Sequence, residues 1–310
     1  MMFLFFIPEI SIAQEARLVP LFSITADYTD QKLDSPGDVF IDEKNSEIYI
    51  LDLGNRRVVV FDMDGFFRYQ FAIPSKLGAP SGLVLNDQDE ILLAVGGKIA
   101  VCDFRGSFLE YVKLDDFPDA EKVKVTRLKI GKENNYYILD AGEQRVLVFD
   151  SDWNFEFAID EKSLPNSKNL VNGKLQEAPM VKSLSISDIW TDDEGKIYLI
   201  DSMASYVFVF NNKGEYLRSI GEPGATFNTL SFPSGVAVDS QGRVLVVDTT
   251  GHALLGYNKR GRLLFALGGI GKSEGRFYFP KYVSTDKSGR IYVVEPFLNR
   301  IQVLTVESSF

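Results

Sequence analysis

A chain of 310 residues, 45% of them hydrophobic, carries enough apolar side chain to bury a large core. Its 43 acidic residues outnumber its 33 basic residues, and the resulting net charge of −10 argues against a nucleic-acid partner, because phosphates require a basic face. Cys102 is the single cysteine, so a disulfide within the chain is excluded, and its position predicts a small buried residue on a strand.

The N-terminal segment is similar to the end of a secretory signal peptide. Residues 1–7 are strongly apolar, and Ser11-Ile12-Ala13 supplies small residues at offsets that suit cleavage before Gln14. We therefore interpret residues 1–13 as a signal-peptide remnant and residues 14–310 as a single mature domain, periplasmic or extracellular. The alternative is a short apolar tail that packs on the domain or stays disordered. No stretch of the mature sequence is apolar for long enough to span a membrane.

Next along the chain comes an isolated apolar strand, residues 18–24, and then six repeats. Each repeat contains a run of apolar residues, ended in all but the second repeat by a carboxylate. The runs recur at intervals of roughly 40 to 60 residues: Ile48–Asp52, Ile91–Ala94, Tyr136–Asp140, Ile197–Asp201, Val244–Asp248 and Ile291–Glu295. Repeats of this length, rich in short strands, predict an all-β fold, a six-bladed β-propeller.

Each repeat is predicted to contain four strands joined by polar turns. In the fifth repeat, a short apolar strand leads through Asp239–Gly242 into Val244–Asp248, and Gly242 supplies the positive φ that such hairpins need. The last repeat has no fourth strand after its third. We therefore expect Leu18–Ile24 to pair with Ile301–Val306 and close the ring, because closure removes exposed sheet edges.

The repeats resemble those of the NHL-repeat family. Ser231–Asp239, followed by Gly242 and by Val246–Asp248, is similar to the family's repeat core, and Asp52–Val58 matches its Asp, Asn and Arg positions. The resemblance covers residues 18–306 and implies a six-bladed propeller that acts by binding a partner. NHL domains that bind RNA do so with a basic surface, which an acidic chain does not provide.

Enzymes with similar propellers define the alternative function. Amidating lyases that share this fold hold zinc with several histidines, and His252 is the single histidine of this chain, so that site is excluded. Propeller lactonases hold calcium with Glu, Asn and Asp at the channel mouth, and this leaves a metal-assisted hydrolase or lyase as the second hypothesis. We predict no metal and no other cofactor, with a cation at the channel mouth as the alternative.

Carboxylates that recur at one place in the repeats are interpreted as structural. Asp52, Asp140, Asp201, Asp248 and Glu295 each end a strand, where a carboxylate can accept backbone N–H bonds from the adjacent turn. The segment Asp62–Gly65 is similar to the start of a calcium loop, but it lies where every repeat has a hairpin and lacks the later ligands. We therefore interpret it as a turn.

One set of polar residues departs from the repeat pattern. At the position near the channel mouth where NHL repeats usually have glycine, the six repeats carry Asp38, Gly82, Arg127, Asp188, Gly235 and Tyr282. In a six-fold ring the two aspartates would face each other, with Arg127 beside Asp188. Two interpretations are open: an Arg127–Asp188 ion pair that plugs the channel, or a site for a small polar ligand or cation.

The connections that follow the fourth strands predict where a partner binds. The connection from the third to the fourth repeat is the longest, and it lies on the same face as the hairpins after the second strands. Our candidate contacts on this face are Arg56, Phe117, Met180, Met203, Tyr206, Phe297 and Leu298. The favoured function is a non-catalytic binding scaffold for a protein, peptide or glycan.

Overall fold

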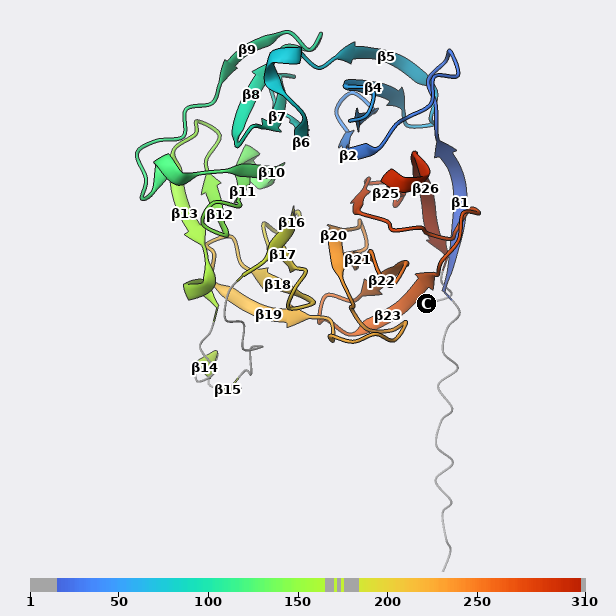
Figure 1. Cartoon of the computed structure of the whole chain (residues 1–310). Helices are drawn as coiled ribbons and strands as arrows, with labels where there is room; N and C mark the ends of the chain where they lie inside the picture. Colours follow the sequence, from blue (N-terminus) through green and yellow to red (C-terminus); the bar gives the residue numbers. More distant parts are fainter. Residues whose placement is uncertain (1–15, 165–169, 172–173, 176–183, 308–310) are drawn as a thin grey trace, which may run out of the picture.

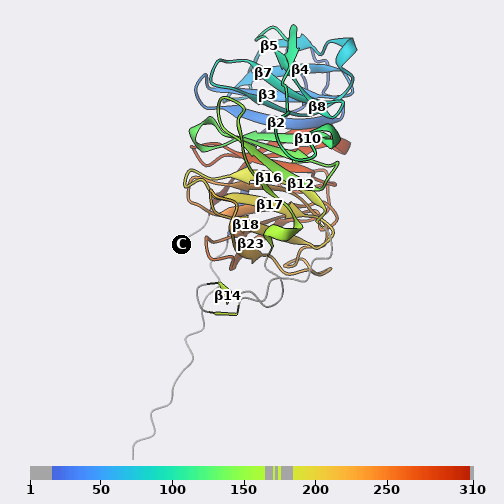
Figure 2. The ribbon, with the colours of Figure 1, turned by 90° about the vertical axis from the view of Figure 1, so that its left-hand side faces the viewer.

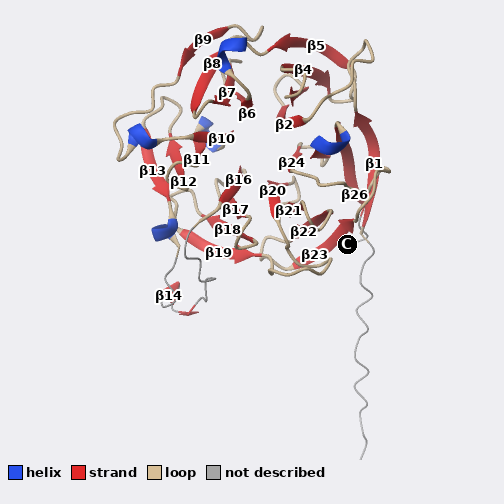
Figure 3. Cartoon of the chain, in the orientation of Figure 1, coloured by secondary structure: helices blue, strands red, loops and turns tan. Residues whose placement is uncertain are grey.

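Six four-stranded antiparallel sheets surround a central axis and confirm the predicted six-bladed propeller (Figure 1). The computed structural model describes residues 16–164, 170–171, 174–175 and 184–307. Figure 2 shows the ring edge-on. Short 3-10 helices of the described residues lie in the connections between strands (Figure 3): η1 (Ser75–Leu77), η2 (Ala120–Lys122), η3 (Lys132–Asn134), η4 (Glu161–Ser163) and η5 (Pro296–Leu298). In the described part of the chain, no helix has the length and hydrophobicity needed to cross a bilayer.

The strands follow the repeats of the sequence. Blade 1 contains β2 (Pro36–Asp42), β3 (Glu47–Asp52), β4 (Arg57–Asp62) and β5 (Phe67–Ala72). Blade 2 contains β6 (Pro80–Leu85), β7 (Ile91–Val95), β8 (Lys98–Cys102) and β9 (Phe108–Tyr111). Blade 3 contains β10 (Val125–Ile130), β11 (Tyr136–Asp140), β12 (Arg145–Phe149) and β13 (Phe155–Ile159). The pair β14 (Leu170–Val171) and β15 (Lys174–Leu175) lies in the long connection that follows.

The remaining blades repeat the same order from the axis outward. Blade 4 contains β16 (Ile186–Thr191), β17 (Ile197–Asp201), β18 (Tyr206–Phe210) and β19 (Tyr216–Ile220). Blade 5 contains β20 (Pro233–Val238), β21 (Val244–Asp248), β22 (Ala253–Tyr257) and β23 (Leu263–Gly268). Blade 6 contains β24 (Tyr282–Thr285), β25 (Ile291–Glu295), β26 (Arg300–Glu307) and, as its outer strand, β1 (Arg17–Ile24).

The ring is closed by its N-terminal strand, as predicted. β1 pairs antiparallel with β26 from Arg17 opposite Glu307 to Ile24 opposite Ile301, with a register shift between Pro20 and Phe22. The proline therefore lies on the outermost strand of the sheet, where a missing N–H is tolerated. The two ends of the propeller thus share one blade, and this pairing holds the first and last repeats together.

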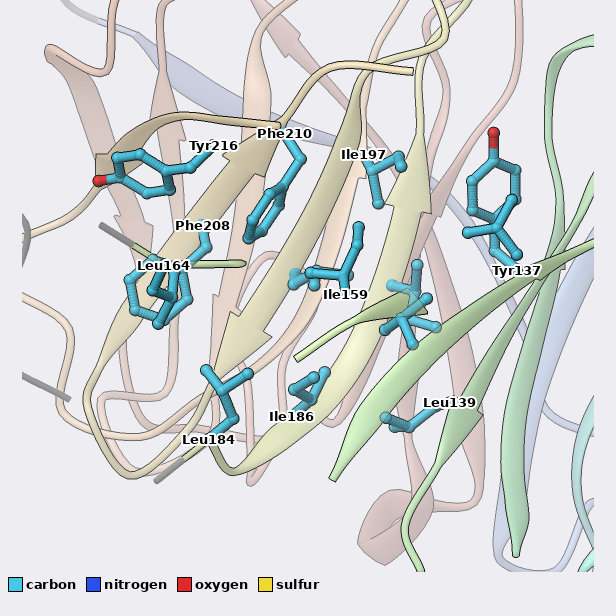
Figure 4. Close-up of a cluster of buried hydrophobic side chains, with 14 residues drawn as sticks. Tyr137, Leu139, Ile159, Leu164, Leu184, Ile186, Ile197, Phe208, Phe210 and Tyr216 are labelled. Carbon is cyan, nitrogen blue, oxygen red and sulfur yellow. The ribbon is translucent and has the colours of Figure 1, made fainter. Parts of the chain in front are cut away.

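Apolar side chains fill the spaces between neighbouring blades. Figure 4 shows the cluster between blades 3 and 4, where Tyr137 and Leu139 from β11 meet Ile186, Ile197 and Phe208 from blade 4. All are at most 8% exposed. Full burial of one such side chain contributes about 1.5–3 kcal/mol, so the interfaces between blades are a main source of stability. Cys102 is also fully buried, as predicted, and burial raises the pKa of its thiol to about 11.

The repeated carboxylates support the loops, which confirms their structural interpretation. Asp52 accepts the Asp34 backbone N–H at 2.7 Å and the Arg57 Nε–H at 2.7 Å. Equivalent backbone contacts join Lys124 to Asp140, Ser185 to Asp201, Phe232 to Asp248 and Tyr278 to Glu295. The Asp62–Gly65 segment is a hairpin, in which Asp62 accepts the N–H groups of Asp64 and Phe66.

Candidate functional site on the propeller axis and loop face

The ring has two faces with different chain segments. We call the loop face the side that carries the hairpins between second and third strands, residues 53–56, 96–97, 141–144, 202–205, 249–252 and 296–299. We call the turn face the side that carries the turns between first and second strands, residues 43–46, 86–90, 131–135, 192–196, 239–243 and 286–290. Innermost strands run from the loop face to the turn face and line the axis.

A β-bulge near the start of the innermost strand places the channel-mouth residues. In blade 1 the register of β2 against β3 shifts between Pro36 and Asp38. The innermost strand of each of blades 2 to 5 has a shift at the same place. A bulge redirects the side chains that follow it. The residues that the sequence aligned all pair with the penultimate position of the second strand: Asp38, Gly82, Arg127, Asp188, Gly235 and Tyr282.

Arg127 joins both aspartates at the centre of this ring. Its Nη2 lies 3.1 Å from Asp188 Oδ1 and 3.2 Å from Asp38 Oδ1. The guanidinium carbon lies 3.8 Å from the centre of the Tyr282 ring, which is a cation–π contact. Burial opposes the positive charge of Arg127, but the two carboxylates outweigh it and raise the arginine pKa. Arg127, Asp38 and Asp188 are each at most 3% exposed.

The remaining carboxylate oxygens are bound to the scaffold. Asp38 Oδ2 accepts the Leu83 N–H of blade 2 at 3.1 Å, and Asp188 Oδ2 accepts the Val236 N–H of blade 5 at 3.0 Å. The network therefore contacts every blade of the ring. Of the two interpretations left open by the sequence, this geometry favours a structural plug, and the plug includes Asp38 as well as the expected Arg127–Asp188 pair.

Two glycines of this ring should differ in how well they tolerate the methyl group that a substitution by alanine adds. A Cβ on Gly235 would lie 2.8 Å from the backbone Cα of Tyr282, whereas a Cβ on Gly82 would be no closer than 3.6 Å to any atom. We expect Gly235→Ala to destabilise the protein by about 1–3 kcal/mol, because β20 and β24 would have to separate. Gly82→Ala is the matched control and should change stability little. Urea unfolding of both variants measures this, and equal stability would contradict the close approach.

A pocket of about 510 Å³ opens on the loop face over blades 4, 5 and 6. Hydroxyl groups form one part of its wall: the Ser202 Oγ lies 2.7 Å from the Ser187 Oγ, and the Thr249 Oγ1 lies 2.6 Å from the Ser234 Oγ. The remaining lining residues are Ser185, Phe232, Phe279, Lys281, Tyr282, Pro296 and Phe297, most of them apolar or aromatic. Such a lining suits a ligand with both apolar and hydrogen-bonding surface.

Aromatic side chains continue from this pocket across blades 5 and 6. Phe279 lies 4.6 Å from His252 and 5.6 Å from Phe297, measured between ring centres, and Tyr278 lies 4.9 Å from Phe279. His252 Nδ1 accepts the Phe279 backbone N–H at 3.1 Å. This bond holds Phe279 in a left-handed conformation with φ of 48°, which is unfavourable for an aromatic residue without such support.

The predicted contact residues have different environments. Phe297 and Met203 are 72% and 76% exposed, and Arg56 is also exposed, all on the loop face. Tyr206 and Leu298 are half-buried. Met180 lies outside the described residues.

Phe117 was predicted to be a contact residue on the loop face, but its side chain is not available for contact. Its side chain is 9% exposed and stacks on Phe155 with ring centres 5.1 Å apart. It also meets Phe149 edge-on at 5.4 Å. The connection folds back so that this ring fills the core between blades 2 and 3, because burying an aromatic ring is more favourable than leaving it in water.

Sequence reasoning missed the hydroxyl-rich wall of the pocket. Ser187 and Ser234 occupy the extra position of the bulges in β16 and β20, and Ser202 and Thr249 directly follow the second strands. Recurrence of Ser or Thr at the bulge, including Ser81 and Thr126 in blades 2 and 3, was the available signal. It could not indicate that these hydroxyls face a shared pocket.

The six four-stranded sheets define the chain as a six-bladed β-propeller. A protein family described as a 6-bladed beta-propeller matches residues 181–264. A search of curated proteins finds no match. Within the described residues, no group of three or more His, Cys, Asp or Glu side chains is placed to hold a metal ion.

Solved structures with this fold have diverse activities. A streptogramin B lyase is 13% identical with a TM-score of 0.62, covering 95% of this chain and 98% of the other. A gluconolactonase from Xanthomonas campestris is 13% identical with a TM-score of 0.61, covering 95% and 92%. A protein of unknown function from Bacteroides thetaiotaomicron is 15% identical with a TM-score of 0.63, covering 95% and 76%. At such identities the similarity shows the fold alone.

Proposed function

We propose that this propeller is a non-catalytic binding scaffold that takes a protein, peptide or glycan partner on its loop face. The observation that carries the proposal is the pocket over blades 4 to 6, whose hydroxyl wall adjoins the exposed ring of Phe297. Aromatic side chains carry much of the energy of interfaces, and an exposed apolar tip on an acidic chain is typical of a contact surface. Kinship with NHL-repeat propellers is part of the proposal.

The axial carboxylates give less support to the alternative of a metal-assisted hydrolase or lyase. Catalysis of that kind needs carboxylate oxygens free to hold a cation or to move a proton. Here Asp38 and Asp188 are both engaged by Arg127 and by backbone N–H groups of neighbouring blades. A cation at this position would have to displace the guanidinium, so the binding role is the better supported of the two.

The test compares capture of a partner by matched variants. We expect Met203→Ala combined with Phe297→Ala to weaken capture from the envelope of the source cell by at least about tenfold, since loss of one interface anchor costs more than about 1.4 kcal/mol. Both side chains are more than 70% exposed, so the melting temperature should change little. Capture is measured by affinity purification with quantitative mass spectrometry.

Phe66→Ala is the control for that experiment. Phe66 is 71% exposed but lies in the turn between β4 and β5, on the opposite side of the blade from the loop face. Loss of apolar surface alone would affect both variants, whereas a loop-face site is affected by the double variant only. Partners captured equally by all three proteins would argue against binding at this face.

Export to the periplasm or the cell exterior is a further part of the proposal. The apolar segment and the small residues before Gln14 support it. Protein recovered from the source cell should begin near Gln14 and should be found in the envelope or the medium. N-terminal sequencing of fractionated protein measures this, and an intact Met1 on cytoplasmic protein would exclude export.

A further inference from the structure

A second cavity lies on the propeller axis and opens at the turn face, opposite the loop-face pocket. Its volume is about 300 Å³, within the range of small-molecule sites. Innermost strands of all six blades contribute to the wall: Val39, Phe40, Val84, Lys129, Trp190, Val238, Ser284 and Thr285 line it. The proposed loop-face function does not use this cavity, and the Arg127 network lies between the two sites.

Lys129 is the cation of this wall, and it has no anionic partner of its own. Among the described residues, no carboxylate or carbonyl oxygen accepts a hydrogen bond from its Nζ, which lies 5.4 Å from the centre of the Trp190 ring. The nearby Asp38 and Asp188 give their oxygens to Arg127 and to backbone N–H groups. Burial lowers the pKa of the Lys129 ammonium, as does Arg127, while the two aspartates oppose that shift.

The mouth of the cavity is acidic, but its carboxylates mostly accept hydrogen bonds from neighbouring groups of the protein. Asp239 accepts hydrogen bonds from the Arg243 N–H and Nε–H, and Asp286 accepts them from the Arg290 N–H and the Tyr292 hydroxyl. Glu43, Asp192, Asp193 and Lys287 complete the rim. A ligand with several negative charges would be repelled here, whereas a single negative charge could reach the ammonium beyond the rim.

We propose that this cavity binds a small monocarboxylate with an apolar tail. The carboxylate would pair with Lys129 and accept from the Ser284 hydroxyl, and the tail would lie among Phe40, Trp190 and Val238, which are only partly buried. The lysine ammonium, which has no acceptor in the described protein, supplies the attraction for the charge. The apolar and aromatic walls supply the attraction for the tail.

Benzoate is a suitable probe because it combines one negative charge with a ring that fits the apolar wall. Benzamide has the same shape without the charge, and inorganic phosphate carries more charge without the ring. Binding to the full chain is measured by isothermal titration and by saturation-transfer NMR. We expect benzoate to bind about 10- to 100-fold more tightly than benzamide, the effect of one charge-assisted hydrogen bond. Phosphate should not compete.

Lys129→Met tests the assignment of the lysine. This variant keeps the length of the side chain and removes its charge, and we expect benzoate binding to weaken by about 10- to 100-fold. Lys213→Met is the control, because Lys213 is exposed on blade 4 and its loss changes net charge equally. Melting temperatures of both variants confirm that they fold. Unchanged benzoate binding by Lys129→Met, equal binding of benzamide, displacement by phosphate, or no binding of benzoate would each overturn the proposal.

Discussion

Removal of residues 14–24 is expected to open the propeller and to lower its stability. The truncation takes away all of β1, whose pairing with β26 is the only sheet contact that joins the first described strand to the last. Ile24 is 3% exposed and belongs to the cluster between blades 6 and 1, and Leu18 packs on the cluster between blades 5 and 6. Lost apolar burial alone should cost at least about 3 kcal/mol.

The unpaired edge of β26 adds a second consequence. An eight-residue strand with free N–H and C=O groups is a template for pairing with another chain, so the truncated protein should associate at high concentration. Calorimetry and light scattering measure the two effects. Removal of residues 1–13 alone is the matched control and should leave both unchanged. If the longer truncation melts like the full chain, the closure does not stabilise the ring.

Arg127→Met is expected to have the second large effect, a loss of about 3–5 kcal/mol in the free energy of unfolding. Methionine keeps the apolar stem of the side chain, but Asp38 and Asp188 would remain buried without their shared cation. A buried charge without a partner is much more costly than an exposed one. Urea unfolding of the variant and the wild type measures this loss.

Two further variants test whether the loss of stability comes from carboxylates that are left buried without a cation. Adding Asp38→Asn and Asp188→Asn to Arg127→Met removes the unpaired charges, so this triple variant should regain part of the lost stability. Lys44→Met breaks the exposed Lys44–Asp89 pair and should cost no more than about 1 kcal/mol. If Arg127→Met costs no more than Lys44→Met, the axial network is not a structural plug.

Repetition made much of this fold predictable from the amino-acid sequence. A run such as Ile48–Asp52 reports one strand, its turn and its supporting carboxylate, all of which depend on residues close in the chain. Ring closure was predictable for the same reason, since a last repeat without an outer strand and an unpaired strand at residues 18–24 complement each other. The channel-mouth positions could also be aligned from the sequence, because each lies at the same number of residues from the end of its innermost strand.

Tertiary structure alone decided what those positions do. The sequence placed Arg127 beside Asp188, but only the closed ring brings Asp38 of blade 1 within 3.2 Å of the same guanidinium. Phe117 appeared to be an exposed loop residue until the packing against Phe149 and Phe155 was visible. Hydroxyls of blades 4 and 5 meet in one pocket, and Lys129 faces another. Strands and turns depend on local periodicity, whereas sites on a propeller axis depend on side-chain lengths and directions converging from blades far apart in the chain, and no local pattern encodes that convergence.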